Sequence, residues 1–306
     1  MKITFLGNFE VDYSSETHHA NTLEKLGHEV TRLQEREPIE PFIELPDIFI
    51  WVHTHNWQTP GMDLLVKRLK KEHVPIVSYH LDLWFGLDRQ RDLEDDPFYK
   101  LIDYWFVTDK LMADWLNEYT KVKGFYLPAG VYEPECEMFP KLTNREVVFV
   151  GSKGYHPEWP YRPQLLNWLE DTYGNRFEHY SGEQEAICLK RGWELNQLYA
   201  DTKVVVGDSL CLNFDYPYYW SDRVYETLGR GGFLIMPYIK GLDDTFEDGK
   251  HMVFYEFGDF DDLKKKIDFY LENDDAREYI RKQGHELVKN HHTYTNRWQT
   301  ILDEVL

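Results

Sequence analysis

Cysteine is scarce in this sequence of 306 residues. The three cysteines, Cys136, Cys188 and Cys211, stand far apart and form no C-x-x-C pair. Neither a disulfide framework nor a zinc site of the C-x-x-C type is therefore expected. No apolar run approaches the roughly 20 residues of a membrane-spanning helix, and residues 1–7 lack the apolar stretch and cleavage site of a signal peptide. We expect a soluble, cytoplasmic protein without a membrane span.

Basic residues are also few. The chain has 34 Lys and Arg against 54 Asp and Glu, which gives a net charge of −20. Such a balance disfavours wrapping of duplex DNA and binding to anionic lipid, although a local basic pocket remains compatible with it. Aromatic residues are abundant at 16%, which argues against a disordered chain. The length predicts about two domains.

Short apolar runs alternate with helical patterns in the first half of the chain. A βαβ alternation of this kind predicts a parallel sheet with helices on both faces. The expected strands are residues 3–6, 29–33, 48–52, 76–79, 104–107 and 124–127, and the expected helices are 18–26, 62–72 and 110–119.

A second α/β series follows residues 131–144, which are rich in Pro and Glu and are interpreted as an interdomain linker. The expected strands are residues 147–150, 177–180, 204–206, 233–236 and 253–255. The expected helices are 161–173, 187–199, 222–228, 261–271, 276–288 and 296–306. Two α/β halves in series are therefore predicted.

Ligands of open α/β sheets bind beyond the carboxyl ends of the strands, so the residues after each strand are the candidates. Gly151, Ser152 and Lys153 follow one strand, and Asp208 follows another. Glycine N–H groups and a lysine suit a phosphate, but the G-x-x-x-x-G-K-[ST] spacing is absent, and a plain strand-to-helix turn is the alternative. Arg162, with Trp159 before it, suits a charged ligand that carries a ring, or ordinary packing.

Residues 222–234 carry the strongest pattern. Arg223 and Glu226 share one face of an expected helix, while Gly231 and Gly232 stand before the next strand. Arg223 is a candidate for binding a pyrophosphate, and Glu226 for accepting hydrogen bonds from two ribose hydroxyls. The alternative is a solvated ion pair within the helix, worth a few tenths of a kcal/mol. Both glycines would permit close approach of the next strand.

The pattern R-x-x-E-x-x-x-x-G-G of residues 223–232 resembles the signature of CgeB-like glycosyltransferases, which belong to the group-1 (GT4-type) glycosyltransferases of GT-B fold. The resemblance covers most of residues 146–300 and ends in a T-Y-x-x-R segment at residues 293–297. It implies two Rossmann-like doubly wound domains that face a central cleft. The implied division is residues 1–139 for the acceptor, 140–290 for the nucleotide sugar, and 291–306 as a helix that crosses back to the first domain.

The resemblance also implies a nucleoside diphosphate sugar donor, with a UDP-sugar favoured, and no cofactor and no metal. In related retaining enzymes two glutamates stand eight residues apart. Glu226 matches the second of them, but Tyr218 stands where the first would be, so the stereochemical outcome is left open. Tyr218 belongs to an aromatic run, residues 216–220, that is a candidate wall beside the sugar or the base, or else a hydrophobic plug.

Histidines near the expected strand ends of the first half are the candidates for acceptor chemistry. His80 and Asp82 suit a general base with its orienting carboxylate, or a loop histidine beside a helix-starting Asp. His53 and His55 have metal-binding spacing but lack a visible third ligand, so no metal site is expected. His18 and His19 are candidates for contact with an acceptor or a phosphate, or surface groups.

The predicted reaction is transfer of a sugar to the hydroxyl of a glycan, a protein or a small molecule. Three alternatives remain open. They are a nucleotide-sugar epimerase of the same fold, a binding module that recognises a nucleotide or glycan without turnover, and a phage-type transferase that modifies DNA bases. A nucleic-acid acceptor is disfavoured by the charge of −20.

Overall fold

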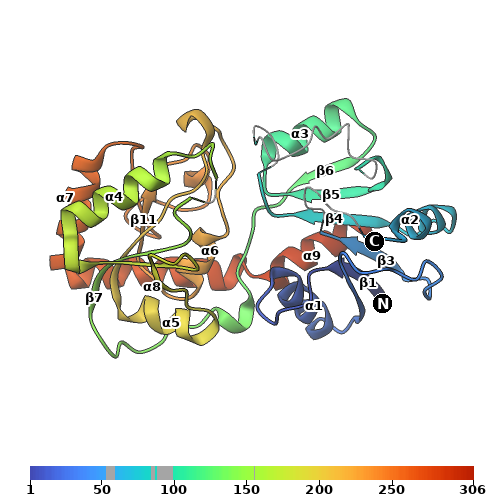
Figure 1. Ribbon diagram of the computed structural model, residues 1–306, viewed down its shortest axis with the longest axis horizontal. Coiled ribbons are helices and arrows are strands. Elements are labelled where there is room, and N and C mark those ends of the chain that lie inside the picture. Colours follow the sequence, from blue (N-terminus) through green and yellow to red (C-terminus); the bar gives the residue numbers. More distant parts are fainter. Residues whose placement is uncertain (53–58, 84–86, 88–98, 155) are drawn as a thin grey trace. The chain divides into compact units, whose positions relative to one another are not determined.

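The structure is a computed structural model that describes residues 1–52, 59–83, 87, 99–154 and 156–306. Within these residues the chain forms two compact units (Figure 1). The first unit consists of Met1–Pro128 and Tyr294–Leu306, and the second is Ala129–Thr293. Each unit contains one six-stranded parallel sheet, so the predicted α/β class is confirmed.

The first unit has the strand order β2-β1-β3-β4-β5-β6. Parallel neighbours require crossover connections, and helices supply those from β1 to β2, from β3 to β4 and from β5 to β6. The strands are β1 (Lys2–Gly7), β2 (Glu29–Gln34), β3 (Ile48–Trp51), β4 (Ile76–His80), β5 (Tyr104–Val107) and β6 (Lys123–Tyr126). The helices are α1 (Ser15–Lys25), α2 (Met62–Lys71), α3 (Lys110–Tyr119) and α9 (Tyr294–Val305).

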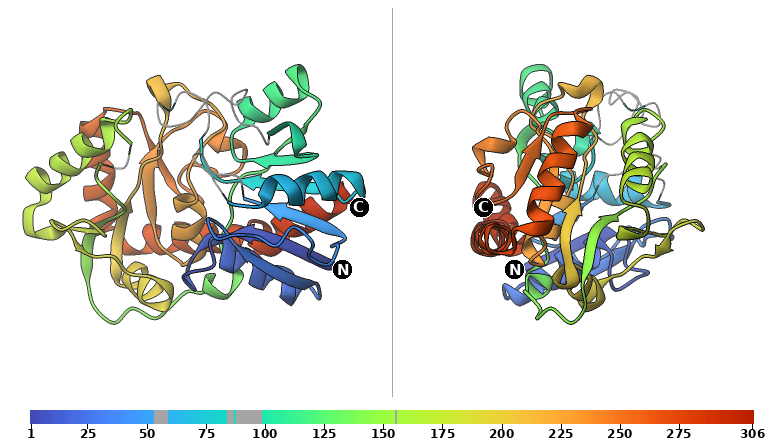
Figure 2. Two further views of the ribbon diagram at one scale, coloured as in Figure 1. Left: turned by 45° about the vertical axis from the view of Figure 1, so that its right-hand side comes forward. Right: turned by 90° about the vertical axis from the view of Figure 1, so that its left-hand side faces the viewer.

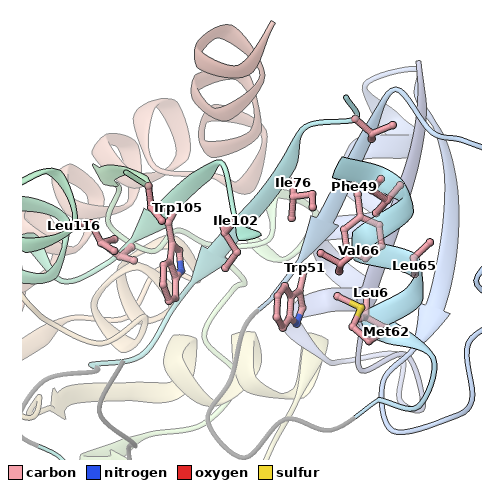
Figure 3. Packing of buried hydrophobic residues seen from close by; sticks show 14 of the residues in the cluster. Leu6, Phe49, Trp51, Met62, Leu65, Val66, Ile76, Ile102, Trp105 and Leu116 are labelled. Carbon is pink, nitrogen blue, oxygen red and sulfur yellow. The ribbon is translucent and has the colours of Figure 1, made fainter. Parts of the chain in front are cut away.

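Both faces of this sheet are covered. On one face α2 places Met62, Leu65 and Val66 against Phe49 of β3 in one cluster, as Figure 3 shows. On the other face α1 and α9 pack together over the strands, with Trp298 of α9 fully buried. Because strands buried on both faces read as continuous apolar runs, the sequence of β3 follows directly from this layering, while β4 also buries the polar Ser78 and His80.

The second unit has the strand order β12-β11-β10-β7-β8-β9, and helices flank its strands (Figure 2, right). The strands are β7 (Arg145–Val150), β8 (Phe177–Ser181), β9 (Ile187–Cys188), β10 (Thr202–Val206), β11 (Leu234–Pro237) and β12 (Val253–Tyr255). The helices are α4 (Tyr161–Tyr173), α5 (Gly192–Asp201), α6 (Arg223–Gly229), α7 (Phe260–Glu272) and α8 (Asp274–His291).

The helix expected over residues 187–199 is wrong at its start. Ile187 and Cys188 form the edge strand β9, which pairs with Tyr180 and Ser181 of β8. Helix α5 begins only at Gly192, whose φ is 53°. That left-handed backbone favours glycine and interrupts any helix that would run through it.

Each sheet extends to both sides of its first strand, which is β1 in the first sheet and β7 in the second. In the second sheet the chain starts at β7 and then extends to β8 on one side and β10 on the other. Such a switch point leaves a crevice beyond the carboxyl ends of the two strands where ligands bind. The residues after β7 and β10 are therefore the candidates for a ligand-binding site.

Among the described residues, no helix is long and apolar enough to cross a lipid bilayer.

Candidate functional site

Two guanidinium groups lie against one aromatic ring at the switch point of the second sheet. The ring is that of Phe149 in β7, and its centroid is 4.8 Å from Arg223 Cζ and 6.0 Å from Arg162 Cζ. Burial, with the like charge of Arg162, lowers the pKa of Arg223 from its usual 12.5. Holding these two cations close together therefore lowers the stability of the folded chain.

Arg162 is neutralised by a buried carboxylate. Its Nε donates to both oxygens of Asp208, at 2.9 and 3.1 Å, and its Nη1 donates to the Ser152 carbonyl at 3.1 Å. Asp208 is fully buried and also accepts a hydrogen bond of 2.9 Å from Trp159 Nε1. Asp208 thus fixes the position of Arg162 and does not face solvent, which makes it a positioning residue.

Arg223 has a different environment. Its Nη1 donates to the Val150 carbonyl, and a Cβ on Gly151 would lie 2.6 Å from its Nη2. Glycine is thus needed at position 151 for the guanidinium to approach the backbone, and its φ of 138° also disfavours other residues. In the part of the chain that the structure describes, no carboxylate forms an ion pair with Arg223. The cluster of Arg162, Asp208 and Arg223 therefore carries one net positive charge.

The loop after β7 is already bonded to a carboxylate. Glu183 accepts hydrogen bonds from the backbone N–H groups of Lys153 and Gly154, at 2.8 and 3.3 Å. Burial opposes ionisation of Glu183, but these N–H groups outweigh it and lower its pKa. Lys153 Nζ bonds to Asn167 Oδ1 at 2.6 Å. A phosphate would have to displace Glu183 to reach these two N–H groups.

Glu226 lies in the middle of α6 and is accessible. Its side chain is 32% exposed, and its Oε1 is 4.0 Å from Arg230 Nη2. Arg230 itself is buried and bonds to Asn196 Oδ1 at 2.6 Å and to Glu135. Because Arg230 has these stronger partners, the Glu226 carboxylate keeps capacity to accept further hydrogen bonds.

Gly231 and Gly232 end helix α6. The N–H of Gly231 bonds to the Leu228 carbonyl and that of Gly232 to the Thr227 carbonyl, at 2.9 and 2.7 Å. A Cβ on Gly231 would lie 2.6 Å from the Met138 side chain, and its φ is 76°. The hydrogen bonds of these two glycines account for the end of helix α6. The lack of a side chain at Gly231 lets residue 138 approach closely.

Tyr218 lies against Gly241, where a Cβ would come within 2.4 Å of the tyrosine ring. Its hydroxyl donates to Asp244 Oδ2 at 2.9 Å, and its φ is 54°. Farther along the aromatic run, Tyr219 and Trp220 are buried, and Trp220 Nε1 donates to the Tyr225 hydroxyl. The run therefore combines a half-buried Tyr218 with two side chains that belong to the core.

His80 is the last residue of β4 and Asp82 follows it, so both lie at the carboxyl edge of the first sheet. His80 is 1% exposed, and its ring centroid is 6.5 Å from that of Trp105. Asp82 is half-buried and lies close enough to Glu16 to act on its ionisation. His53 and His55, considered above as metal ligands, lie outside the described residues.

Glu16 was not identified from the sequence, yet it lies at the same edge. Its side chain crosses over Gly7 at the end of β1, where a Cβ would be 2.6 Å from Glu16 Cγ. Burial, together with the negative charges of Glu35 and Asp82, raises the pKa of Glu16 to about 7. The only signal in the sequence is its place two residues after a helix N-cap, Ser14.

The raised pKa of Glu16 predicts a pH-dependent stability. Between pH 4.5 and about 7 the folded chain binds a proton that the unfolded chain releases, so the free energy of unfolding falls as the pH rises through this window. We expect Glu16→Gln to make this pH-dependent decrease in the free energy of unfolding smaller by about 1–3 kcal/mol. Urea unfolding at pH 5 and pH 8 measures it, with the exposed Glu304→Gln as the control. The same change in the free energy of unfolding between pH 5 and pH 8 in Glu16→Gln and in wild type would contradict a raised pKa of Glu16.

His19 is a core residue, which overturns the expectation of a ligand contact or a surface group. It is 1% exposed, stacks on Tyr294 with ring centroids 3.9 Å apart, and accepts a hydrogen bond from Trp298 Nε1 at 3.1 Å. Burial lowers its pKa to about 3, so it stays neutral. His19 thus joins α1 to α9 within the first unit.

Among the described residues, no group of three or more His, Cys, Asp or Glu side chains is arranged to hold a metal ion.

Residues 137–303 match the protein family described as glycosyl transferase-like. No curated protein matches the sequence. The family match confirms the glycosyltransferase resemblance, whereas the narrower CgeB-like relationship stays a prediction.

Several solved glycosyltransferase structures are similar to this chain in fold. An α-glucosyltransferase in complex with UDP and DNA containing an HMU base is 14% identical, with a TM-score of 0.70 over 100% of this chain and 99% of that chain. Anabaena HepE in complex with UDP and glucose is 13% identical, with a TM-score of 0.63 over 100% of both chains. Sucrose-phosphate synthase from Thermosynechococcus elongatus is 12% identical, with a TM-score of 0.62 over 99% and 98%. These matches confirm the predicted GT-B fold.

Proposed function

This chain belongs to the glycosyl transferase-like family, and we infer that it transfers a sugar from a nucleoside diphosphate sugar to the hydroxyl of an acceptor. UDP is the favoured nucleotide, since the α-glucosyltransferase and HepE structures hold UDP. Glycans, proteins and small molecules are the acceptor classes that fit the acidic chain best.

The environment of Arg223 is the main observation that supports this proposal. It is a partly buried cation at the switch point of the second sheet, and the described residues offer it no carboxylate. A diphosphate supplies the missing negative charge, and a guanidinium binds phosphate oxygens in a bidentate manner. The same contact would stabilise the negative charge that develops on the leaving nucleoside diphosphate. Ser152, Lys153 and Arg162 complete the proposed phosphate side.

We assign the ribose to Glu226 and a sugar contact to Tyr218. Glu226 has free acceptor capacity, and two ribose hydroxyls each donate one hydrogen bond to such a carboxylate. Asp208 acts through Arg162, while Gly151, Gly231 and Gly232 shape the backbone around α6. On the acceptor side, His80 or Asp82 would take the proton of the attacking hydroxyl.

Glu226→Gln is expected to weaken UDP binding by about tenfold or more, because hydrogen bonds to a charged acceptor contribute about 1.5–3 kcal/mol. Calorimetric titration with UDP and with 2′,3′-dideoxy-UDP tests the ribose role. The variant should lose affinity for UDP and none for the dideoxy compound. The exposed Glu272→Gln is the matched control. Normal UDP affinity in Glu226→Gln would refute the assignment.

A thermal-shift screen against UDP, GDP, ADP and their sugars tests the proposed function itself. A bound donor at a hundredfold excess over its dissociation constant stabilises the fold by ~2.7 kcal/mol. Transfer to an acceptor separates a transferase from an epimerase, which changes the donor sugar alone. Binding without any turnover would indicate a recognition module.

A DNA base is the second candidate acceptor, because the α-glucosyltransferase structures contain DNA. The net charge of −20 opposes tight binding to a duplex. DNA binding measured at low and at moderate salt distinguishes the two. Affinity that falls steeply with salt would favour the DNA acceptor, and no affinity at low salt would exclude it.

A further inference from the structure

Three aromatic rings lie together beside the Arg162–Asp208 pair. Trp159 precedes α4, Phe214 follows β10 and Phe257 follows β12, so all three belong to the carboxyl edge of the second sheet. The centroid of Phe214 is 5.3 Å from those of Trp159 and Phe257, and Trp159 is 5.6 Å from Phe257. We call these three rings the aromatic platform.

The platform has a fixed base and an open rim. Trp159 is 3% exposed and is held through its Nε1 by Asp208. Phe214, in contrast, is 53% exposed, and Phe257 is half-buried. Large apolar side chains at the rim of a polar site are a common way to bind the apolar part of a ligand.

The backbone that presents Phe214 is strained. Asn213 and Phe214 have φ values of 56° and 61°, and neither is glycine. Asparagine adopts a left-handed conformation more readily than other non-glycine residues, but for a bulky residue such as Phe214 it costs about 1–3 kcal/mol and persists at sites where the conformation has a use. Burial of the Phe214 side chain does not offset this conformational free energy, because about half of the side chain stays exposed to solvent.

We propose that the aromatic platform binds the apolar face of the donor's hexose ring. The inference rests on the proposed function, which places the diphosphate at Arg223 and Arg162. Asp208 bonds to both Arg162 and Trp159, so the platform lies one side chain beyond the phosphate-binding cations. The hexose is bonded directly to the diphosphate. Its C–H groups carry partial positive charge and suit the negative face of an aromatic ring.

Calorimetric titration of Phe214→Ala with UDP and with UDP-glucose tests this inference, with GDP and GDP-mannose as a second pair. The nucleoside diphosphate is common to both members of a pair, so a loss confined to the sugar nucleotide reports on the hexose. We expect Phe214→Ala to weaken binding of the sugar nucleotide by about three- to tenfold and to leave the nucleoside diphosphate within twofold. Phe214→Trp should retain the wild-type ratio.

Phe269→Ala is the matched control, because Phe269 is 52% exposed on α7 and lies outside the platform. Equal losses for UDP and UDP-glucose in Phe214→Ala would assign the platform to the nucleobase and overturn the inference, as would no loss at all. Failure of the wild-type chain to bind either pair would instead overturn the proposed function.

Discussion

Replacing Arg223 by methionine should reduce turnover by about 10²–10³-fold, the loss that follows removal of one preorganised donor to a developing negative charge. Affinity for UDP should fall by about 10- to 100-fold, since a charged hydrogen bond contributes about 1.5–3 kcal/mol. The reason is structural. Arg223 rests on Phe149 and Val150 with no carboxylate partner among the described residues, so its charge is available to a ligand. Steady-state kinetics and titration with UDP measure the two effects.

The same variant should fold at least as well as wild type. Burial and the charge of Arg162 lower the pKa of Arg223, which means that the folded chain without ligand disfavours this cation. Arg223→Met removes the repulsion and keeps an apolar stem on the Phe149 ring. A thermal melt without ligand should therefore show an unchanged or raised midpoint. Stability sacrificed for function in this way is typical of binding sites.

Arg223→Lys separates charge from geometry. Lysine keeps the positive charge but lacks the planar fork that binds two phosphate oxygens. We expect its UDP affinity to lie between those of wild type and Arg223→Met. Wild-type turnover in Arg223→Met would place the diphosphate elsewhere on the chain.

The fold was predictable from the sequence because its signals are local. Strands buried on both faces leave apolar runs such as residues 48–52, and helices between them leave a period of 3.6 residues. Candidate residues after β7 and β10 could be named for the same reason, since the carboxyl end of a strand is marked in sequence by the end of its apolar run. Arg223 and Glu226 came from a motif within one short helix.

Contacts between distant segments were not predictable. Glu183 bonds to the loop after β7 from 30 residues away, and Trp159 reaches Asp208 across 49 residues. No periodicity in the sequence records which carboxylate will find which donor. The same holds for Glu16, whose pKa is raised by burial and by the charges of Glu35, which follows β2, and Asp82, which follows β4.

Backbone strain was equally hidden. Asn213 and Phe214 carry no glycine or proline signal, yet both adopt left-handed φ values. A left-handed position can be recognised in a sequence only where the residue type favours that conformation, and phenylalanine does not favour it. The exposed rim of the aromatic platform could be recognised only once the loops after β10 and β12 were placed side by side.

Replacing Asp208 by asparagine should destabilise the second unit by about 3–5 kcal/mol, the usual result of removing one partner from a buried ion pair. Asp208 is fully buried and supplies the only carboxylate that the described residues bring to Arg162. Without its charge, Arg162 and Arg223 both remain beside the Phe149 ring, and no carboxylate among the described residues forms an ion pair with either of them. For a unit of this size the midpoint of thermal unfolding should fall by about 2–4 °C per kcal/mol. Glu194→Gln, which breaks an exposed pair with Lys190, should cost at most about 1 kcal/mol.

A second substitution distinguishes loss of charge balance from loss of packing. If uncompensated charge is the cause, Asp208→Asn combined with Arg162→Met should recover much of the stability, because replacing both members of a buried pair by groups of similar volume is often neutral. UDP should also stabilise Asp208→Asn more than wild type, since a diphosphate supplies negative charge to a cluster that then carries two positive charges. A loss below about 1 kcal/mol in Asp208→Asn, or a double variant less stable than the single one, would show that the Arg162–Asp208 pair does not hold this edge of the sheet together.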